Sequence, residues 1–300
     1  MKKTISYLFA SAGLLVVLAL GSCSKSESLP AIDGYNSSND VAKANLVAHW
    51  TFDDTNNEAI SSTAPTKTVG TVGFTTGKIG KALLLTKGGI VYPAITKINT
   101  VDALNNFTVS LWVNTVNQKG VVGGGFQSFF GIIPVATDFW GNIQACAQTD
   151  QHLPSSDTLV LKNYLNVAGN GQDNVALLNS DPADANHPDG QTGKWFLGAK
   201  DWVHYVMTWE GSTGLFYMYA NGVLVGGYSH RGTTTGVMKL GIPVLAVFGS
   251  MASSDLGFAG ATRPVWAPLA TASIDDVRVY NTVIAQKDVT ALFDLGTAGR

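Results

Sequence analysis

The chain has 300 residues, of which 45% are hydrophobic and only 13% charged, with a formal net charge of −2 at pH 7. This slightly acidic balance lacks the concentrated positive charge of nucleic-acid-binding domains, so nucleic acid is excluded as a partner. The length is ample for one large hydrophobic core, and abundant Gly with few charges is typical of exported β-proteins.

The N-terminus carries the features of an export signal. Two lysines precede an apolar run over residues 8–20, which is too short and wrongly flanked for a spanning helix. The following "LGSC", ending at Cys23, resembles a bacterial lipobox, and the resemblance implies cleavage before Cys23 and lipid attachment to it. An ordinary signal peptide whose cleavage site contains a cysteine is the alternative. We therefore predict a signal peptide over residues 1–22 and an outer-membrane or cell-surface lipoprotein, attached to the membrane by its lipid alone.

Cleavage at this point leaves 17 basic residues against 21 acidic ones, a net charge of −4. Cys146 then has no partner for a disulfide, so we expect it to be a small buried residue. Residues 24–44 are rich in Ser, Asn and Asp and lack apolar periodicity. We therefore predict that residues 23–44 form a lipidated, flexible tether.

From Asn45 onward, short runs rich in Val, Ile, Thr and aromatic residues alternate with Gly, Asn and Asp, which is typical of antiparallel strands. The clearest strands are predicted at 46–52, 81–86, 107–115, 202–209, 215–220, 223–228 and 273–280. Asn221-Gly222 predicts a type I′ hairpin turn. Close to the C-terminus, a helix is predicted from one apolar face, with Gly296 expected to end it. The residues on that face are Ile284, Val289, Leu292 and Phe293.

Residues 202–228 hold two Trp, four Tyr and one Phe, which raises the question of a platform for stacking a sugar. Strand alternation divides this stretch between two faces. The core face is predicted to hold Tyr205, Met207, Trp209, Phe216, Met218 and Ala220. On the other face, a second layer or a groove could cover His204, Thr208, Tyr217 and Tyr219.

The segments "LVAHWTFDD", "GKIGKALLL", "FTVSLWV" and "IDDVRVYNTVIAQKDVTALF" follow one another in the order of a known domain. Over residues 45–297 the chain resembles the laminin-G-like, concanavalin A-like domains of bacterial surface proteins, of the type found in Bacteroidetes. The resemblance implies an all-β, two-sheet antiparallel jelly-roll sandwich with a short C-terminal helix. Residues 114–201 and 229–272 exceed the usual length, so we expect extra strands or binding loops there.

The fold alone does not decide function, because it carries lectins, adhesion modules and hydrolases. A glycoside hydrolase needs two facing carboxylates, but the chain has only Glu27, Glu58 and Glu210 and no Glu-x-Asp-x-Glu strand. Metal-hydrolase and nucleophile-elbow motifs are also missing from the sequence. We therefore predict non-catalytic binding of a polysaccharide or glycoconjugate. The alternatives are a structural or adhesive module with a protein partner, and a hydrolase with an Asp-based site.

Asp275 in "SIDDVRVY" alternates with Val277 and Val279, so it is expected to point inward, where a carboxylate needs hydrogen bonds or a metal ion. The resemblance implies a structural Ca²⁺ near Asp275 and Asp53, with Asn56 as a weaker ligand. Capping of backbone amides by Asp275, or its pairing with Arg278 or Lys81, is the alternative.

Aromatic side chains beside polar ones in the long segments are the candidates for glycan contact. These residues are Trp195, Trp266, Trp140, His187 and Asp189. Each ring has a core position as its alternative, and for Trp140 the core position is favoured. The triple glycine at 123–125 lacks the Lys-Ser/Thr of a phosphate-binding loop and is expected to permit a tight turn.

Overall fold

The computed structural model describes residues 29–134, 141–166, 172–176, 196–228 and 240–300, and every structural statement below concerns these residues. Thirteen strands join in one sheet in which every pairing is antiparallel. The first six strands are β1 (Leu46–Trp50), β2 (Lys67–Thr76), β3 (Lys81–Tyr92), β4 (Asn106–Thr115), β5 (Gln127–Ile133) and β6 (Ile143–Ala147). The rest are β7 (Leu161–Asn166), β8 (Gln172–Ala176), β9 (Trp202–Glu210), β10 (Leu215–Ala220), β11 (Val223–Tyr228), β12 (Leu245–Phe248) and β13 (Ala270–Tyr280).

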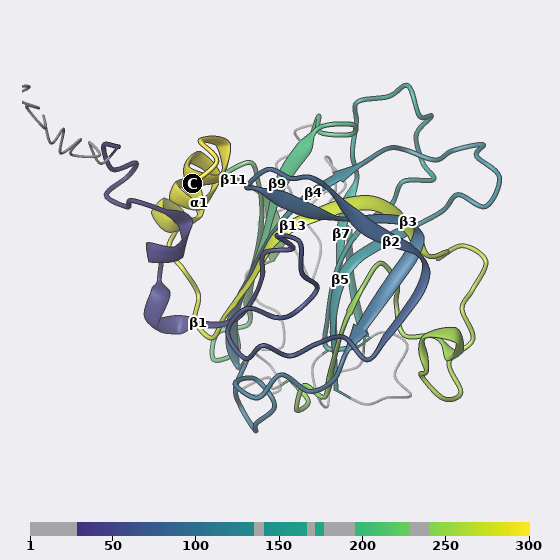
Figure 1. Ribbon diagram of the computed structural model, residues 1–300, viewed down its shortest axis with the longest axis horizontal. Helices are drawn as coiled ribbons and strands as arrows, with labels where there is room; N and C mark the ends of the chain where they lie inside the picture. Colours follow the sequence, from purple (N-terminus) through teal and green to yellow (C-terminus); the bar gives the residue numbers. More distant parts are fainter. Residues whose placement is uncertain (1–28, 135–140, 167–171, 177–195, 229–239) are drawn as a thin grey trace, which may run out of the picture. The chain divides into compact units, whose positions relative to one another are not determined.

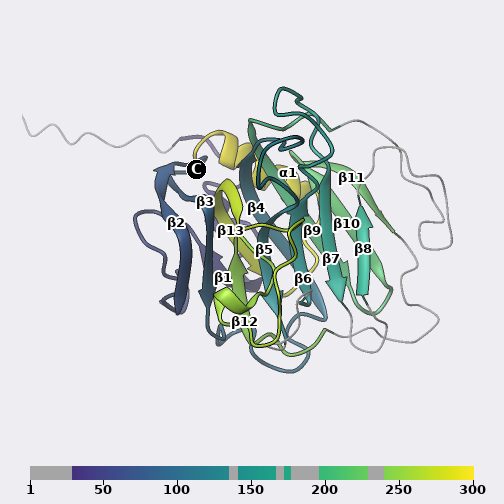
Figure 2. The ribbon, with the colours of Figure 1, turned by 90° about the vertical axis from the view of Figure 1, so that its right-hand side faces the viewer.

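The sheet curls until its two halves face each other. Its order is β11-β10-β9-β4-β13-β3-β12-β5-β6-β7-β8, with β1 on β13 and β2 on β3. The long strand β3 belongs to both halves, because it pairs with β13 through its first residues and with β12 through its last. Figure 1 shows the two layers edge-on, and Figure 2 shows β5 to β8 following one another across one layer. The fold is therefore an all-β jelly-roll sandwich, as predicted.

The core lies between the two layers. Trp50 of β1 packs its ring against three others, with centroids 5.3 to 5.5 Å away, contributed by Tyr92, Phe130 and Phe248. These three rings come from β3, β5 and β12 and are fully buried, as is Trp50 itself. Edge-to-face ring contacts add to the burial of apolar area, so this cluster ties the two layers together.

The seven predicted strands are all present, and the turn at Asn221-Gly222 is confirmed by φ values of +51° and +76°. The long segments contain five strands that were not predicted, β5 to β8 and β12, and these build most of the second layer. Cys146 lies on β6 and is fully buried, as expected, and burial raises the pKa of its thiol. Much of the extra length of segments 114–201 and 229–272 therefore forms strands of the sandwich.

Helix α1 (Gln286–Thr297) lies on the outer face of the layer that contains β9, β4 and β13 (Figure 1). It buries Val289, Leu292 and Leu295, and no described helix is long and apolar enough to cross a membrane. We expected the helix to end at Gly296, but it continues through this residue to Thr297. A Cβ at Gly296 would lie 2.6 Å from the Trp112 indole, so the glycine permits close packing of the helix on β4.

The second part of the predicted tether is structured, which differs from our expectation. Residues 31–300 form one compact unit, and the chain makes the short helices η1 (Ser38–Asp40) and η2 (Lys43–Asn45) before β1. Val41 is fully buried against α1, and Ser38 N donates to Arg300 O. These contacts fix residues 31–44 although their sequence lacks periodicity, because tertiary partners supply the stability that local pattern does not.

Candidate functional site

The aromatic face of β9 and β10 is covered and cannot act as a sugar platform. His204 and Tyr219 are buried, and the ring of Trp112 packs against both His204 and Phe293 of α1, with centroids 5.0 and 5.8 Å away. His204 Nε2 is 2.8 Å from Ser110 Oγ, and burial lowers the pKa of His204 to about 3. The opposite face is core, as predicted, with Tyr205, Met207 and Trp209 fully buried.

A β-bulge in β13 changes the direction of two carboxylates. Ile274 and Val277 both belong to the core, and between them Asp276 adopts a φ of +46°. The register with β4 shifts there, so that Asp275 opposes Trp112 on the α1 side of the sheet. The expectation that Asp275 shares the face of Val277 is therefore wrong, because a bulge inserts one residue and interrupts the alternation. Both aspartates face the same side.

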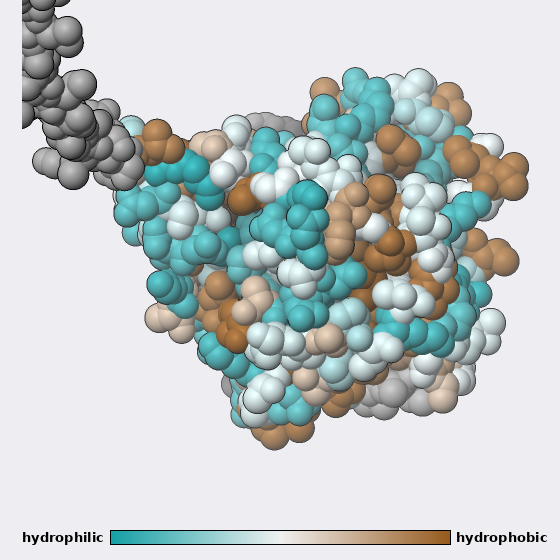
Figure 3. Space-filling model, in the orientation of Figure 1, coloured by the Kyte–Doolittle hydropathy of each residue, from teal (hydrophilic) through white to brown (hydrophobic). Residues whose placement is uncertain are grey.

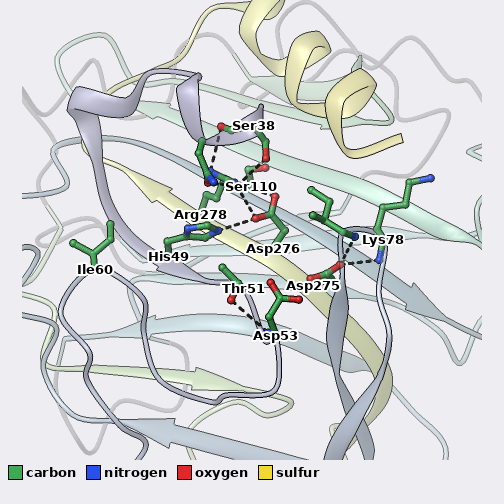
Figure 4. A network of polar contacts seen from close by, with 12 residues as sticks. Ser38, His49, Thr51, Asp53, Ile60, Lys78, Ser110, Asp275, Asp276 and Arg278 are labelled. Carbon is green, nitrogen blue, oxygen red and sulfur yellow. Dashed lines mark hydrogen bonds and ion pairs between the residues drawn. The ribbon is translucent and has the colours of Figure 1, made fainter. Parts of the chain in front are cut away.

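Asp276 is the centre of a buried ionic network (Figure 4). Its Oδ1 lies 2.7 Å from His49 Nε2, and Arg278 Nε donates to its Oδ2 at 2.9 Å. Arg278 Nη2 also donates to Ser38 Oγ and Asn39 Oδ1, both at 2.9 Å. Burial by itself raises the pKa of Asp276, but the charge of Arg278 and the contact with His49 hold it well below its usual value. The network joins β1, β13 and the N-terminal segment.

Asp275 caps backbone amides of the turn before β3. Its Oδ2 accepts hydrogen bonds from Lys78 N at 2.7 Å and Ile79 N at 2.9 Å. A Cβ on Gly77 would lie 2.5 Å from that oxygen, so glycine is required for the turn to approach. The other oxygen, Oδ1, is buried and has no described partner. Burial, helped by the negative charge of Asp276, raises the pKa of Asp275 to about 7, against the lowering effect of hydrogen bonds from backbone amides.

Asp53 and Asp275 line one cavity of about 90 Å³, which we call the carboxylate cavity. Figure 4 shows Asp53, Thr51 and Asp275 lying close together at its wall. Asp53 Oδ1 accepts a hydrogen bond from Lys81 N at 2.8 Å, and a Cβ on Gly80 would collide with it. The remaining wall is formed by Ser38, Asn39, His49, Ile79, Asp276, Arg278 and Arg300.

Two carboxylates of this cavity suit a cation, but the cavity offers few further side-chain ligands. The buried, unpaired Asp275 Oδ1 and the Asp53 carboxylate are oxygen ligands of the kind that Ca²⁺ prefers. No group of three or more His, Cys, Asp or Glu side chains in the described residues converges on one point, so backbone oxygens would have to complete a shell. Asn56 does not line the cavity, and its backbone carbonyl accepts the Tyr92 hydroxyl.

A second region lies where three loops meet, at residues 116–126, 148–156 and 263–269. Hydrophobic side chains gather at the upper right of Figure 3, where the teal loops of Figure 1 lie. Trp266 is 42% exposed there, and its ring packs against Phe126 at 5.9 Å. Phe126 N donates to Trp266 O at 2.9 Å, which holds the first and third loops together.

Buried amides fix these loops from below. Gln118 Oε1 accepts hydrogen bonds from Gly125 N at 3.0 Å and from Gln127 Nε2 at 3.1 Å. Gln127 Oε1 in turn accepts Thr271 N of β13 at 2.7 Å. Gly123 has a φ of +70°, as a tight turn requires, and a Cβ on Gly125 would lie 2.6 Å from Trp266 O. These hydrogen bonds fix the region where the three loops meet, which we call the loop end, in the absence of a ligand.

An open groove of about 340 Å³ runs beside these loops, and we call it the loop groove. Its polar wall contains Thr86, Lys87 and Thr271, and its lining includes the buried amides of Asn117 and Gln118. The remaining lining is formed by Val116, Val121, Val122, Gly123, Gly124, Pro154 and Leu269. This mixture of apolar surface with a few fixed polar groups is typical of small-ligand sites.

The described glutamates have structural roles. Glu58 is fully buried, and its carboxylate accepts hydrogen bonds from His49 N at 2.7 Å and Ser61 N at 2.6 Å. Glu210 is the last residue of β9, and its carboxylate accepts the Thr213 hydroxyl. Neither lines the carboxylate cavity or the loop groove, so they do not form the facing pair of a glycoside hydrolase there.

Of the predicted glycan contacts, only Trp266 lies among the described residues. Trp140, Trp195, His187 and Asp189 fall outside them, as does Cys23. Sequence reasoning missed Lys87, Gln118 and Gln127. Their only signals were the glycines that follow Lys87 and Gln118, at 88–89 and 123–125.

No protein-family model and no curated protein matches the chain. Solved structures resemble it in fold. Domain 4 of AbnA, a GH43 extracellular arabinanase from Geobacillus stearothermophilus solved with arabinotriose, has a TM-score of 0.50 and 19% identity, covering 83% of this chain and 98% of that one. The botulinum neurotoxin serotype D ligand-binding domain, solved with N-acetylneuraminic acid, has a TM-score of 0.51 and 11% identity over 86% of this chain and 52% of that one.

The binding domain of botulinum neurotoxin DC, solved with rat synaptotagmin II, has a TM-score of 0.53 and 11% identity, covering 85% of this chain and 52% of that one. This chain thus corresponds to about half of each toxin domain. At these identities the likeness shows a shared β-sandwich fold. The class of protein that these structures define is therefore the β-sandwich domain.

Proposed function

We propose that the protein is a non-catalytic glycan-binding module whose contact surface is the loop end around Trp266. The observation that carries this proposal is the exposed ring of Trp266, held on a rigid loop pair beside an open groove. A flat apolar ring stacks on the C–H face of a sugar, and fixed amide and hydroxyl groups nearby select its orientation. The complexes of the fold relatives with arabinotriose and N-acetylneuraminic acid support the proposal.

The test is a glycan-array measurement on the full-length chain, followed by titration of the best ligand. We expect Trp266→Ala to weaken binding by about 1–3 kcal/mol, on the scale of a lost aromatic contact. Tyr217→Ala is the matched control, because that ring is half-buried on the face that α1 covers. Its binding should equal that of the wild-type protein.

Three results would contradict the proposal. If no glycan is retained while a purified envelope protein binds, the module is adhesive. Release of reducing sugar from a polysaccharide, abolished by one Asp→Asn change, would make the protein a hydrolase. Equal losses of affinity in the Trp266 and Tyr217 variants would place the contact elsewhere.

We also propose that the carboxylate cavity holds one structural Ca²⁺, with Asp275 and Asp53 as ligands. The unpaired oxygen of Asp275 supports this, since a buried carboxylate oxygen without a partner is costly. When bound, the ion would supply positive charge to the two carboxylates and fix the turn before β3. Calorimetry on chelator-treated protein should show Ca²⁺ binding that Asp275→Asn removes and Asp201→Asn, at an exposed turn, retains. An absence of heat with the wild-type protein would refute it.

The N-terminal sequence supports a further proposal, that the protein is exported and anchored by lipid on Cys23. Such an anchor would present the loop end to glycans of the cell envelope. Metabolic labelling with an alkyne fatty acid should modify the wild-type chain but not Cys23→Ala. Labelling that persists in this variant would contradict the assignment of Cys23.

A further inference from the structure

We propose that the loop groove selects acidic sugars, with the ammonium group of Lys87 binding the sugar carboxylate. This inference rests on the proposed glycan function and names the ligand class within it. It starts from the backbone of Lys87, which has a φ of +47° at a bulge in β3. A lysine in this region is strained, and the two residues that follow are glycines, which would adopt such angles freely. A strained non-glycine residue on the wall of a groove points to a role for its side chain.

The position of Lys87 is fixed from two sides. Its backbone N–H donates to Thr271 Oγ1 at 3.1 Å, which ties the bulge to β13. A Cβ placed on Gly123 would lie 3.4 Å from Lys87 Nζ, so the ammonium group sits over the glycine turn of the first loop. The ammonium group therefore lies at the groove wall, beside the loop whose Phe126 contacts Trp266.

The charge balance of the groove favours an anion. Among the described residues that line it, none is Asp or Glu, and Lys87 is exposed. Within the same part of the chain Lys87 forms no ion pair, whereas Lys81 pairs with Asp54 and Lys200 with Asp157. An unpaired ammonium beside an apolar wall attracts a carboxylate more strongly than one surrounded by water.

The remaining lining suits a sugar ring that bears this carboxylate. Thr271 Oγ1 already accepts the Lys87 N–H, so its own hydroxyl hydrogen can be donated into the groove, where Thr86 offers a second hydroxyl. Opposite them, Val121 and Val122 are 48% and 93% exposed and present methyl groups to a ring face or an acyl group. A neutral sugar could use these groups but would form no charge-assisted hydrogen bond with the ammonium.

The experiment compares ligands that differ only in the carboxylate. The full-length protein is titrated with oligogalacturonate and with the same oligomer after reduction of its carboxylates to alcohols, and then with sialyllactose and lactose. In at least one pair we expect the acid to bind about tenfold more tightly, as a charge-assisted hydrogen bond implies. Lys87→Gln should remove this preference, whereas Lys119→Gln, a matched exposed lysine on the neighbouring loop, should retain it. Added salt should weaken the preference.

The outcomes separate this inference from the proposed function. Equal binding of both members of each pair, with loss of affinity in Trp266→Ala, overturns the acidic-sugar inference and leaves glycan binding standing. An equal effect of Lys87→Gln and Lys119→Gln also overturns it, because general surface charge then explains the preference. Competition by octanoate without binding of any sugar overturns both. A preference that only Lys87→Gln removes supports the inference.

Discussion

The carboxylate cavity and the loop groove treat charge in opposite ways. In the cavity, Asp276 and Arg278 are almost fully buried and form an ion pair. Asp276 also contacts His49, and Arg278 donates a hydrogen bond to Ser38. In the groove, Lys87 is exposed and forms no ion pair with a described residue. Buried charges must be satisfied within the protein, whereas an exposed charge on a rigid wall is available to a ligand. Stability should therefore depend on the first region and ligand selection on the second.

The largest effect on stability is expected from Arg278→Met. Removing the guanidinium leaves Asp276 buried with only His49 beside it, and breaking a buried pair costs about 3–5 kcal/mol. Urea unfolding followed by Trp fluorescence measures this loss. Lys81→Met is the control, because the side chains of Lys81 and its partner Asp54 are 51% and 66% exposed, and such surface pairs contribute about 0–1 kcal/mol. Similar losses in both variants would contradict the contrast between buried and exposed charge.

The next effect concerns Asp275 and is pH-dependent. Its folded-state pKa of about 7 lies above the ordinary value of 3.8, so folding favours the protonated acid. That contribution is fully present below pH 3.8 and is lost as the pH rises through 7. Without Ca²⁺, the unfolding free energy of the wild-type protein should fall as the pH rises from about 4 to 7. Relative to the unfolding free energy of Asp275→Asn, the fall should be up to about 1.4 kcal/mol per pH unit. Parallel pH profiles would contradict the raised pKa. Added Ca²⁺ should stabilise the wild-type protein more at pH 8 than at pH 6.

A smaller effect is expected from Gln127→Met, which removes the amide that holds the loop groove. Thr271 N then loses its partner and Gln118 Oε1 keeps only Gly125 N, at a cost of about 1–3 kcal/mol. Glycan affinity should fall as well, because the loops that carry Trp266 lose their fixed position. Gln151→Met, at an exposed turn, is the control. Unchanged affinity in a destabilised Gln127 variant would show that the groove does not depend on this network.

The smallest effect on stability is expected from Lys87→Gly. Glycine adopts a φ of +47° without strain, so we expect a gain of about 0.5–1 kcal/mol after the larger unfolded-state entropy of glycine is included. The preference for acidic over neutral sugars should be lost in the same variant. A loss of stability instead would indicate that the Lys87 side chain serves the fold.

The repeating features of the fold could be predicted from the sequence. The alternation that put Tyr205, Met207 and Trp209 in the core was confirmed, as were the hairpin at Asn221 and the C-terminal helix. These features follow local rules of periodicity and turn chemistry, which neighbouring residues satisfy together. Extra strands or binding loops were expected in the long segments, but β5 to β8 were not located from the sequence, because their cross-strand partners and not their own pattern stabilise them.

The candidate sites could be predicted only in part. Asp53 and Asp275 do line one cavity, but the reason given for Asp275 was wrong, since its direction is set by the bulge at Asp276. Trp266 was predicted, whereas the groove beside it was not, because Lys87, Gln118 and Thr271 lie far apart in the sequence. No local pattern reports that these residues meet.

What the sequence determined by itself is a set of antiparallel strands with an alternating core and defined turns, because these depend on spacing along the chain; the sandwich was implied by the family resemblance. Tertiary structure decided which charges are buried and which are open. It placed Arg278 beside Asp276 under the N-terminal segment, and Lys87 over the glycine turn of another loop. Burial and pairing depend on segments brought together from distant parts of the chain, and those contacts fix both the direction of a pKa shift and the place where a ligand can bind.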